Sequence, residues 1–230
     1  MGYREDPPPP ALQAEVECVW RAEVTAPQVL DVLPDGCMDL VWTGTELLVA
    51  GPDTGPHPAR REPGIASTGL RFAPGRLPAL LGAPASAVRD QRVPLAELHP
   101  ALARRAVARL EAGADPVAVL TAVAHALPGE TADPGMRAVV ARLGAGTSVT
   151  DTADALGWTA RSLHRRCLTA FGYGPAVLRR VLRFRRAADL LYAGVPIAQA
   201  AAAAGYADQP HLSREVRAFA GVAPRELAAR

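Results

Sequence analysis

Apolar and polar positions divide the chain into a part with short strand-like runs and a part with helical spacing. Between residues 16 and 72, runs such as "VECVWRAEV", "MDLVW", "TELLVA" and "GLRF" are separated by turns. A Pro-Asp-Gly turn precedes the second of these runs. Short apolar runs bounded by turns are typical of β-strands. Residues 52–64, rich in Pro, Gly and charge, are predicted to form a loop. We therefore expect a small β-rich domain here.

From residue 77 onward the apolar residues follow a helical period. Residues 95–110 show this spacing, and residues 115–127 form a helix that starts at Asp-Pro and stops at Pro128-Gly129. The segment "GETADPG" predicts a linker, after which the pattern is helical to the end. The fold class is therefore α+β: a small β-rich N-terminal domain, a helical linker and an all-α C-terminal domain. We place the two domains at residues 11–130 and 134–230.

The C-terminal part contains an internal repeat. Four pairs of residues are separated by 49 positions: Leu163 and Leu212, Arg165 and Arg214, Gly172 and Gly221, Pro175 and Pro224. Three pairs upstream are separated by 48: Ala153 and Ala201, Gly157 and Gly205, Trp158 and Tyr206. A repeat at fixed spacing indicates one structural unit used twice, with one residue added in the second turn.

Each copy of the repeat predicts two short helices joined by a tight turn. In the first copy, Ser148 or Thr150 caps the first helix and Gly157 ends it. Thr159 then caps a helix over 160–171. In the second copy the helices span 197–204 and 209–221, and Asp208 is the expected cap. Two helices joined by a turn with glycine form a helix-turn-helix, so the C-terminal domain has two such units joined by a long helix.

The second helix of such a unit enters the major groove of DNA. The predicted DNA-binding residues are Arg161, His164 and Arg165 on the first such helix, Gln209, Pro210, Ser213 and Arg214 on the second, and Arg183 on the connecting helix. On the opposite faces, Leu163 and Leu168, and Leu212 and Val216, are expected to face the core. Arginine pairs with guanine and glutamine with adenine, while other arginines contact phosphate.

The connecting segment "PAVLRRVLRFRRAADLLYAG" sets the distance between the units. Roughly 17 helical residues span about 26 Å. With the widths of the flanking helices, the two reading helices are expected about 34 Å apart, one turn of DNA. The units then read two successive major grooves, and their site need not be palindromic.

Charge is distributed unevenly. Residues 160–230 hold twelve arginines and four acidic residues, a net charge of +8, and the other 159 residues hold thirteen arginines and nineteen acidic residues, a net charge of −6. This split favours a nucleic-acid partner, although a solvated arginine-rich surface is the alternative. Three scattered cysteines, no apolar signal core and no long apolar stretch indicate a cytoplasmic protein with no membrane partner.

The C-terminal part resembles the AraC/XylS family of bacterial transcription regulators over about residues 135–230. The resemblance rests on "ADALGWTARSLHRR…FGYGP", "LRFRRAADLL" and "AAAAGYADQPHLSRE…GVAP". The chain departs from the family pattern where Cys167 and Val216 replace phenylalanine and Ala200 replaces a bulkier aliphatic residue, which suggests a smaller core. The resemblance implies a variable N-terminal domain that senses a small molecule or mediates self-association. A short N-terminal domain attached to some members of the family is similar to this chain at "VLPDGCMDLVW", "GPDTG" and "GLRFAPG". The resemblance implies no ligand for that domain.

Several N-terminal residues suggest other chemistry. Metal-ligand spacing is absent among Cys18, Cys37, Asp39, His57 and His99, so we predict no metal and treat the two cysteines as small buried residues. Asp35 and Asp39 are either an acid pair or, as we prefer, a turn followed by an aspartate at a strand edge. Arg71 either binds an anionic ligand or, as we prefer, pairs with an internal acid. His125, within an apolar helix, is expected to be structural, and His211 to cover a helix start.

We therefore predict a sequence-specific DNA-binding transcriptional regulator that responds to a small molecule. It is predicted to be no enzyme and to need no cofactor. The expected partners are double-stranded operator DNA, a small-molecule effector, RNA polymerase and a second copy of the chain. One rival is an enzyme or metal-dependent N-terminal domain fused to a DNA-binding module. Another is an N-terminal domain that only dimerises.

Overall fold

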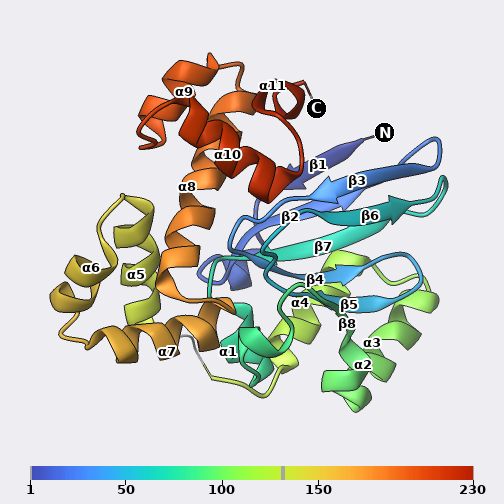
Figure 1. Cartoon of the computed structure of the whole chain (residues 1–230). Helices are drawn as coiled ribbons and strands as arrows, with labels where there is room; N and C mark the ends of the chain where they lie inside the picture. The colour runs from blue at the N-terminus through green and yellow to red at the C-terminus, as the bar shows by residue number, and fades with distance from the viewer. Residues whose placement is uncertain (1, 131–132, 230) are drawn as a thin grey trace.

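The chain begins with strands and ends with helices (Figure 1). The computed structural model describes residues 2–130 and 133–229. Two residues of the expected linker, 131 and 132, and the last residue of the expected second domain, 230, lie outside the described residues. Within the described ranges, no helix combines the length and the apolar character that a membrane span requires. The arrangement confirms the predicted α+β class.

The β-rich part is built on a six-stranded antiparallel sheet with the order β1-β2-β7-β4-β5-β8. In that order the strands are β1 (Tyr3–Asp6), β2 (Val16–Ala22), β7 (Ser67–Phe72), β4 (Met38–Trp42), β5 (Leu47–Ala50) and β8 (Arg92–Pro94). The pairing of β2 with β7 joins segments about fifty residues apart and places Trp20 opposite Gly69. The four inner strands β2, β7, β4 and β5 are the ones that the apolar runs predicted.

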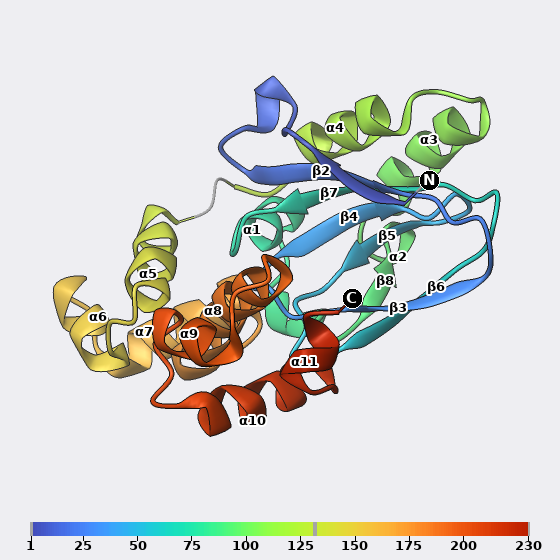
Figure 2. The ribbon, with the colours of Figure 1, turned by 90° about the horizontal axis from the view of Figure 1, so that it is seen from above.

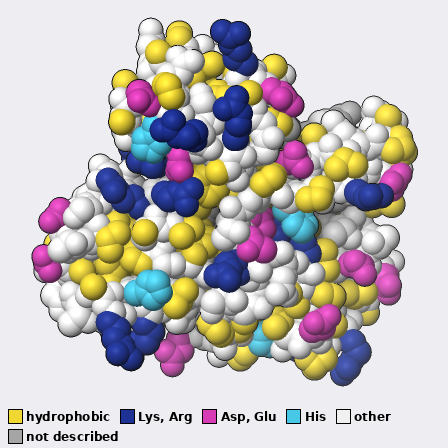
Figure 3. Space-filling view, in the orientation of Figure 1, with side chains coloured by type: hydrophobic (Ala, Val, Ile, Leu, Met, Phe, Trp, Pro, Cys, Tyr) yellow, Lys and Arg dark blue, Asp and Glu magenta, His cyan; other side chains and the backbone are white. Residues whose placement is uncertain are grey.

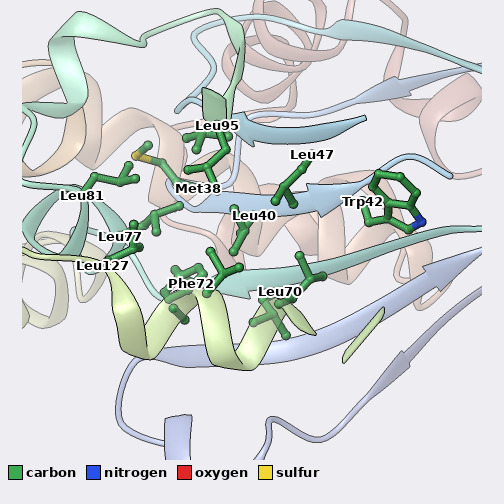
Figure 4. Close-up of a cluster of buried hydrophobic side chains, with 14 of the residues drawn as sticks. Met38, Leu40, Trp42, Leu47, Leu70, Phe72, Leu77, Leu81, Leu95 and Leu127 are labelled. Carbon is green, nitrogen blue, oxygen red and sulfur yellow. The ribbon is translucent and has the colours of Figure 1, made fainter. Parts of the chain in front are cut away.

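One face of this sheet carries the first hydrophobic core. Leu40, Leu70 and Phe72 are fully buried there. Helices α1 (Leu77–Leu81), α2 (Leu95–Leu98), α3 (Pro100–Glu111) and α4 (Pro116–Ala126) supply the other side of the core, with short 3-10 helices at Pro10–Leu12 and Ala85–Ala87. The leucines of these strands and helices point toward one another (Figure 4), and α3 and α4 lie along one side of the sheet (Figure 2). The predicted helix over 95–110 is interrupted at His99, before Pro100.

A separate two-stranded sheet lies on the other side of the main sheet (Figure 2). Its strands are β3 (Gln28–Val32) and β6 (His57–Arg61), with Leu30 opposite Ala59. The prediction of a loop over 52–64 is therefore wrong for β6. Proline is tolerated in edge strands, so Pro58 does not prevent the pairing, although it hides the strand in the sequence. Strands β1, β3 and β8 were also not predicted.

The C-terminal part consists of helices α5 (Pro134–Gly144), α6 (Val149–Ala155), α7 (Ala160–Phe171), α8 (Pro175–Tyr192), α9 (Ile197–Ala203), α10 (Gln209–Ala220) and α11 (Pro224–Leu227). They enclose a second hydrophobic core. Leu163 is fully buried in it, as predicted, but its partner on α7 is Cys167. The prediction for Leu168 is wrong: it is only half-buried and lies outside the core cluster. The reason is that residues four positions apart share a helix face more closely than residues five apart.

The core also extends the repeat upstream. Met136 and Leu143 on α5 occupy the places that Phe184 and Leu191 occupy on α8, and each pair is 48 residues apart. All four are buried in the second core. Each unit is therefore three helices long, α5–α7 and α8–α10, and α8 is both the connector and the first helix of the second unit.

The two parts are in contact along α8 and at the end of α7. Arg185 donates to Glu17 at 2.6 Å and to the sulfur of Cys37 at 3.5 Å. Arg89 donates to the backbone oxygen of Gly172 at 3.0 Å. These contacts attach α8 and the end of α7 to the β-rich part of the chain.

Candidate nucleic-acid interface

The first helix-turn-helix is formed by α6 and α7, and local caps set its ends. The Ser148 hydroxyl accepts a hydrogen bond from the backbone N–H of Asp151 at 3.0 Å, so Ser148 rather than Thr150 is the cap. Gly157 takes a left-handed φ of 66°, which a side chain would strain. The Thr159 hydroxyl then accepts from the N–H of Ser162 at 3.1 Å and starts α7 as predicted.

The second helix-turn-helix is formed by α9 and α10 in the same way. Gly205 has a φ of 79° in the turn. The Asp208 carboxylate accepts from the N–H of His211 at 2.7 Å, which confirms it as the cap of α10. Pro210 lies in the first turn of α10, where its missing N–H costs no hydrogen bond. The ring of His211 lies edge-on to Tyr206 with centroids 5.1 Å apart, over the start of the helix as expected.

The structure brings the predicted residues of each reading helix onto one outward face. On α7, Arg161, His164 and Arg165 are exposed, opposite the buried Leu163 and Cys167. On α10, Gln209, Pro210 and Arg214 are exposed and Ser213 is half-buried, opposite Leu212 and Val216, which are fully buried. Arginine side chains lie over the lobe formed by α9 and α10 at the top of the face in Figure 3.

Three of these arginines have side chains without a protein partner. Within residues 2–130 and 133–229, the side chains of Arg161, Arg165 and Arg214 form no hydrogen bond or ion pair. A guanidinium that the protein leaves unpaired on an exposed helix face is available to a base edge or a phosphate. This face therefore offers positive charge and free donors at both units.

Arg183 differs from the other predicted DNA-binding residues. Its guanidinium lies over the ring of Tyr206 at 4.4 Å, and its Nη2 is 3.5 Å from the Glu215 carboxylate. Arg180 donates to the same carboxylate at 2.9 Å. Arg183 is half-buried in these contacts. They favour a role in positioning α10 over a direct contact with DNA.

The other arginines of the connector are also bound within the protein. Arg179 donates to the backbone oxygen of Gly146 at 2.9 Å, and Arg186 donates to that of Gly144. Together with Arg180, Arg183 and Arg185, these make five connector arginines with internal acceptors. Sequence reasoning placed positive charge on this helix but had no signal for the acceptors, because they come from other segments of the chain, including α10, the end of α5, the turn after it and β2.

A stacked arginine supports the aromatic residue after each turn. In the first unit Arg166 lies over the Trp158 ring at 4.5 Å and pairs with Asp133, the cap of α5, at 2.5 Å. Gly135 leaves room for that ring, because a Cβ there would lie 2.6 Å from it. In the second unit Arg183 plays the corresponding part over Tyr206. The sequence shows the two aromatic residues, but not the arginines that hold them.

The departures from the family pattern lie in the second core. Cys167, Val216 and Ala200 are all fully buried. Each is smaller than the residue that the family pattern expects, so this core holds smaller side chains at these points while the outward faces keep their polar residues.

In the β-rich part, Arg71 pairs with internal acids, as preferred. Its guanidinium lies 3.0 Å from Glu5, 3.4 Å from Asp35 and 3.6 Å from Asp39. Asp35 also accepts from the N–H of Cys37 at 2.8 Å in the predicted turn. Asp39 accepts from the indole N–H of Trp20 at 2.7 Å, and burial raises the pKa of its carboxyl to about 6. The two aspartates therefore meet around an arginine.

The remaining candidates differ in their burial and contacts. Cys18 and Cys37 are buried, and burial raises the pKa of the Cys18 thiol to about 12, so it stays protonated. His99 lies with its Nε2 3.1 Å from the backbone oxygen of Leu81. His125 is exposed on α4, contrary to the structural role expected for it. In the described part of the chain, no group of three His, Cys, Asp or Glu side chains is placed to hold a metal ion.

Comparison with known proteins gives matches in both parts of the chain. Residues 152–230 match the family model of a helix-turn-helix domain, and residues 4–94 match that of a domain of unknown function, DUF6597. No curated protein matches the chain. Among solved structures it is similar to ToxT from Vibrio cholerae at 1.65 Å resolution, with 12% identity, a TM-score of 0.50, and coverage of 100% of this chain and 98% of that one.

A second similar structure is ToxT from Vibrio cholerae O395 bound to (E)-4-(8-methylnaphthalen-1-yl)but-3-enoic acid. It has 12% identity and a TM-score of 0.52, and the match covers 100% of this chain and 99% of that one. At this identity the likeness shows a shared two-part fold.

Proposed function

Because the chain carries an AraC-type helix-turn-helix domain behind a DUF6597 domain, we propose that it is a sequence-specific transcriptional regulator that reads two successive major grooves. DNA binding is the general property of the helix-turn-helix module. The observation that carries the finer proposal is the pair of matching outward faces on α7 and α10, each with an unpaired arginine at the same place in its unit.

The length of α8 supports reading of two grooves. The helix pairs α6–α7 and α9–α10 lie toward opposite ends of this helix (Figure 1). Its 18 residues correspond to about 27 Å of helix. With the widths of α7 and α10 added, the separation approaches the ~34 Å of one DNA turn. Both reading helices then reach one side of the duplex.

We assign roles within the interface by exposure and chemistry. Arg165 and Arg214 are the base-reading arginines, and Gln209 is suited to adenine. Arg161, His164, Pro210 and Ser213 lie beside them and contact the backbone or the groove edge. Arg183 positions α10 through Tyr206 and Glu215.

The N-terminal part is proposed to sense a small molecule and to transmit its state to the DNA-binding helices. The Arg185–Glu17 pair supports this, because it links α8 to β2. A similar fold in ToxT has been seen with a bound aryl-substituted carboxylic acid, which supports an effector of small size. RNA polymerase and a second copy of the chain are further proposed partners. The proposal assigns no catalytic role and no metal to the chain.

Selection of binding sites from random DNA with the full-length protein tests this function. We expect an asymmetric site with two preferred blocks about one helical turn, roughly 10 base pairs, apart. Insertion of five base pairs between the blocks rotates one of them to the opposite side of the duplex and is expected to reduce affinity strongly. Insertion of ten base pairs returns both blocks to the same side of the duplex and is the matched control. A single preferred block, or equal affinity after the five-pair insertion, would contradict reading of two grooves.

A further inference from the structure

A pocket of about 380 Å³ opens where the N-terminal residues meet the turn between β2 and β3. Its walls come from Tyr3, from residues 22–28 of that turn, from Leu30 and from Arg61 of β6. The volume lies within the range of sites for small molecules. None of its lining residues belongs to the DNA-binding faces.

Arg61 is the one cation in the wall of this pocket, and its side chain is not satisfied by the protein. Its Nε and Nη1 atoms are buried and have no hydrogen-bond partner among the described residues. Burial also lowers the pKa of Arg61, because no carboxylate compensates for the loss of water. A buried guanidinium with two unpaired donors is costly to fold. An anion held in the adjoining pocket would compensate the charge of this guanidinium.

Two other arginines of the β-rich part that are largely withdrawn from water are paired with carboxylates. Arg71 is surrounded by three carboxylates, as described above. Arg92 donates to both carboxylate oxygens of Asp53 at 2.9 and 2.7 Å. Among the described residues no acid pairs with Arg61, although β6 belongs to the same layered domain. Unlike Arg71 and Arg92, Arg61 has no carboxylate partner among the described residues, and it lines a pocket.

The surroundings of Arg61 also indicate what the rest of the ligand is like. The guanidinium lies over the Trp20 ring at 5.6 Å, and Tyr3 stacks on the same ring with centroids 6.2 Å apart. Leu30 adds an exposed apolar side chain at the pocket wall. The wall therefore combines aromatic and aliphatic surface with a single positive group. Glu23 also lines the pocket and disfavours a second negative charge on the ligand.

We propose that this pocket binds a small amphipathic monocarboxylate, with its carboxylate paired to Arg61 and its apolar body against Tyr3 and Leu30. The planar fork of arginine matches the two oxygens of a carboxylate. The inference rests on the proposed function, since it names the class of effector that the regulator senses. A phosphate monoester would bring two charges to a site that offers one cation.

Calorimetric titration of the full-length chain with 4-phenylbutanoate tests the proposal. The uncharged 4-phenylbutanamide has the same apolar body, and phenyl phosphate carries the alternative anion. We expect the carboxylate to bind more tightly than either. Arg61→Gln is expected to weaken carboxylate binding at least tenfold, because it removes a charge-assisted pair. The same substitution should change the affinity for 4-phenylbutanamide only slightly.

Arg60→Gln is the matched control. Arg60 is the exposed neighbour on β6, and alternate residues of a strand point to opposite faces. The Arg60→Gln variant should bind 4-phenylbutanoate with the same affinity as the unaltered chain. Leu30→Glu supplies a carboxylate within the pocket, so it should abolish probe binding and raise the melting temperature of the ligand-free protein. This second variant keeps the test valid if Arg61→Gln folds poorly.

The outcomes separate this inference from the proposed function. Failure of 4-phenylbutanoate to bind at millimolar concentration would overturn the inference, as would equal losses in Arg60→Gln and Arg61→Gln. Tighter binding of phenyl phosphate would replace the carboxylate by a phosphate ligand and would also overturn it. Binding of all variants to duplex DNA at low salt is measured in parallel. Retained DNA binding without carboxylate binding refutes the pocket alone, whereas loss of DNA binding by the unaltered chain refutes the regulator.

Discussion

Arg165→Ala and Arg214→Ala test whether the two helix-turn-helix units each read their own half of a DNA site. The two residues occupy equivalent places in the repeat, and both side chains lie exposed on the reading helices α7 and α10. Neither side chain has a partner among the described residues. Their removal should therefore affect DNA binding without disturbing the fold.

The structure sets the size of both effects. Because no internal contact is lost, the free energy of unfolding should change by no more than about 0.5 kcal/mol in either variant. A bidentate contact to guanine contributes about 1–3 kcal/mol to discrimination, so affinity for the selected site should fall roughly 5- to 150-fold. The double variant should show the sum of the two losses, since distant sites are usually additive.

The assay is binding-site selection followed by titration of the selected duplex at one fixed salt concentration. Each variant should relax preference at one position, and the two positions should lie about 10 base pairs apart. Arg105→Ala, which removes the same charge from the exposed face of α3 in the N-terminal part, is the matched control and should leave preference unchanged.

Three results would refute the reasoning. If both variants relax the same base pair, the two units do not read separate grooves. If affinity falls equally for all sequences, the two arginines contact phosphate only. If the melting temperature falls markedly in either variant, the side chain has a structural role that its exposed position does not show.

Other predictions concern stability and domain structure. Burial raises the pKa of Asp39 to about 6, above its unfolded value, so the folded state holds an extra proton between about pH 4 and 6. The contribution of this group to the free energy of unfolding should therefore fall as the pH rises through that range. In urea denaturation, the free energy of unfolding of Asp39→Asn should decrease less with pH than that of the unaltered chain; an unchanged pH dependence would contradict the shift. Phe184→Ala should destabilise by about 3–5 kcal/mol in thermal or urea unfolding, because Phe184 is buried against Phe219 with ring centroids 5.1 Å apart; a loss below 1 kcal/mol would show that the core closes around the gap. A fragment of residues 133–230 should fold and bind DNA non-specifically at low salt, because it contains the second core; a folded fragment without DNA affinity would contradict the division into two domains.

Much of the candidate interface could be predicted from the sequence, because it depends on local chemistry. The caps Thr159 and Asp208, the turn glycines Gly157 and Gly205, and the outward faces of both reading helices follow from residue type and helical period. The repeat shows that the unit occurs twice. The prediction for Leu168 failed, because it relied on a five-residue spacing that helix geometry does not favour.

Predictions that depended on long-range pairing were less complete. Strand β6 was missed because its proline and charged residues resemble a loop, and only its pairing with β3 makes it a strand. The prediction of Arg183 as a DNA contact could not include Tyr206 and Glu215, which lie 23 and 32 residues further along the chain. The pairing of Arg71 with internal acids was preferred from its apolar neighbours, but its three partners come from two distant segments, around residue 5 and over residues 35–39.

The sequence by itself determined the α+β class, the two helix-turn-helix units and the residues on their reading faces. These features are encoded in neighbouring residues, since caps, turns and helical periods act over a few positions. The tertiary structure alone decided which arginines are free. The connector arginines find acceptors on distant segments, Arg71 finds three carboxylates, and Arg61 finds none among the described residues. A guanidinium is neutralised only by groups that folding brings within a few ångströms, and that proximity has no local signal in the chain.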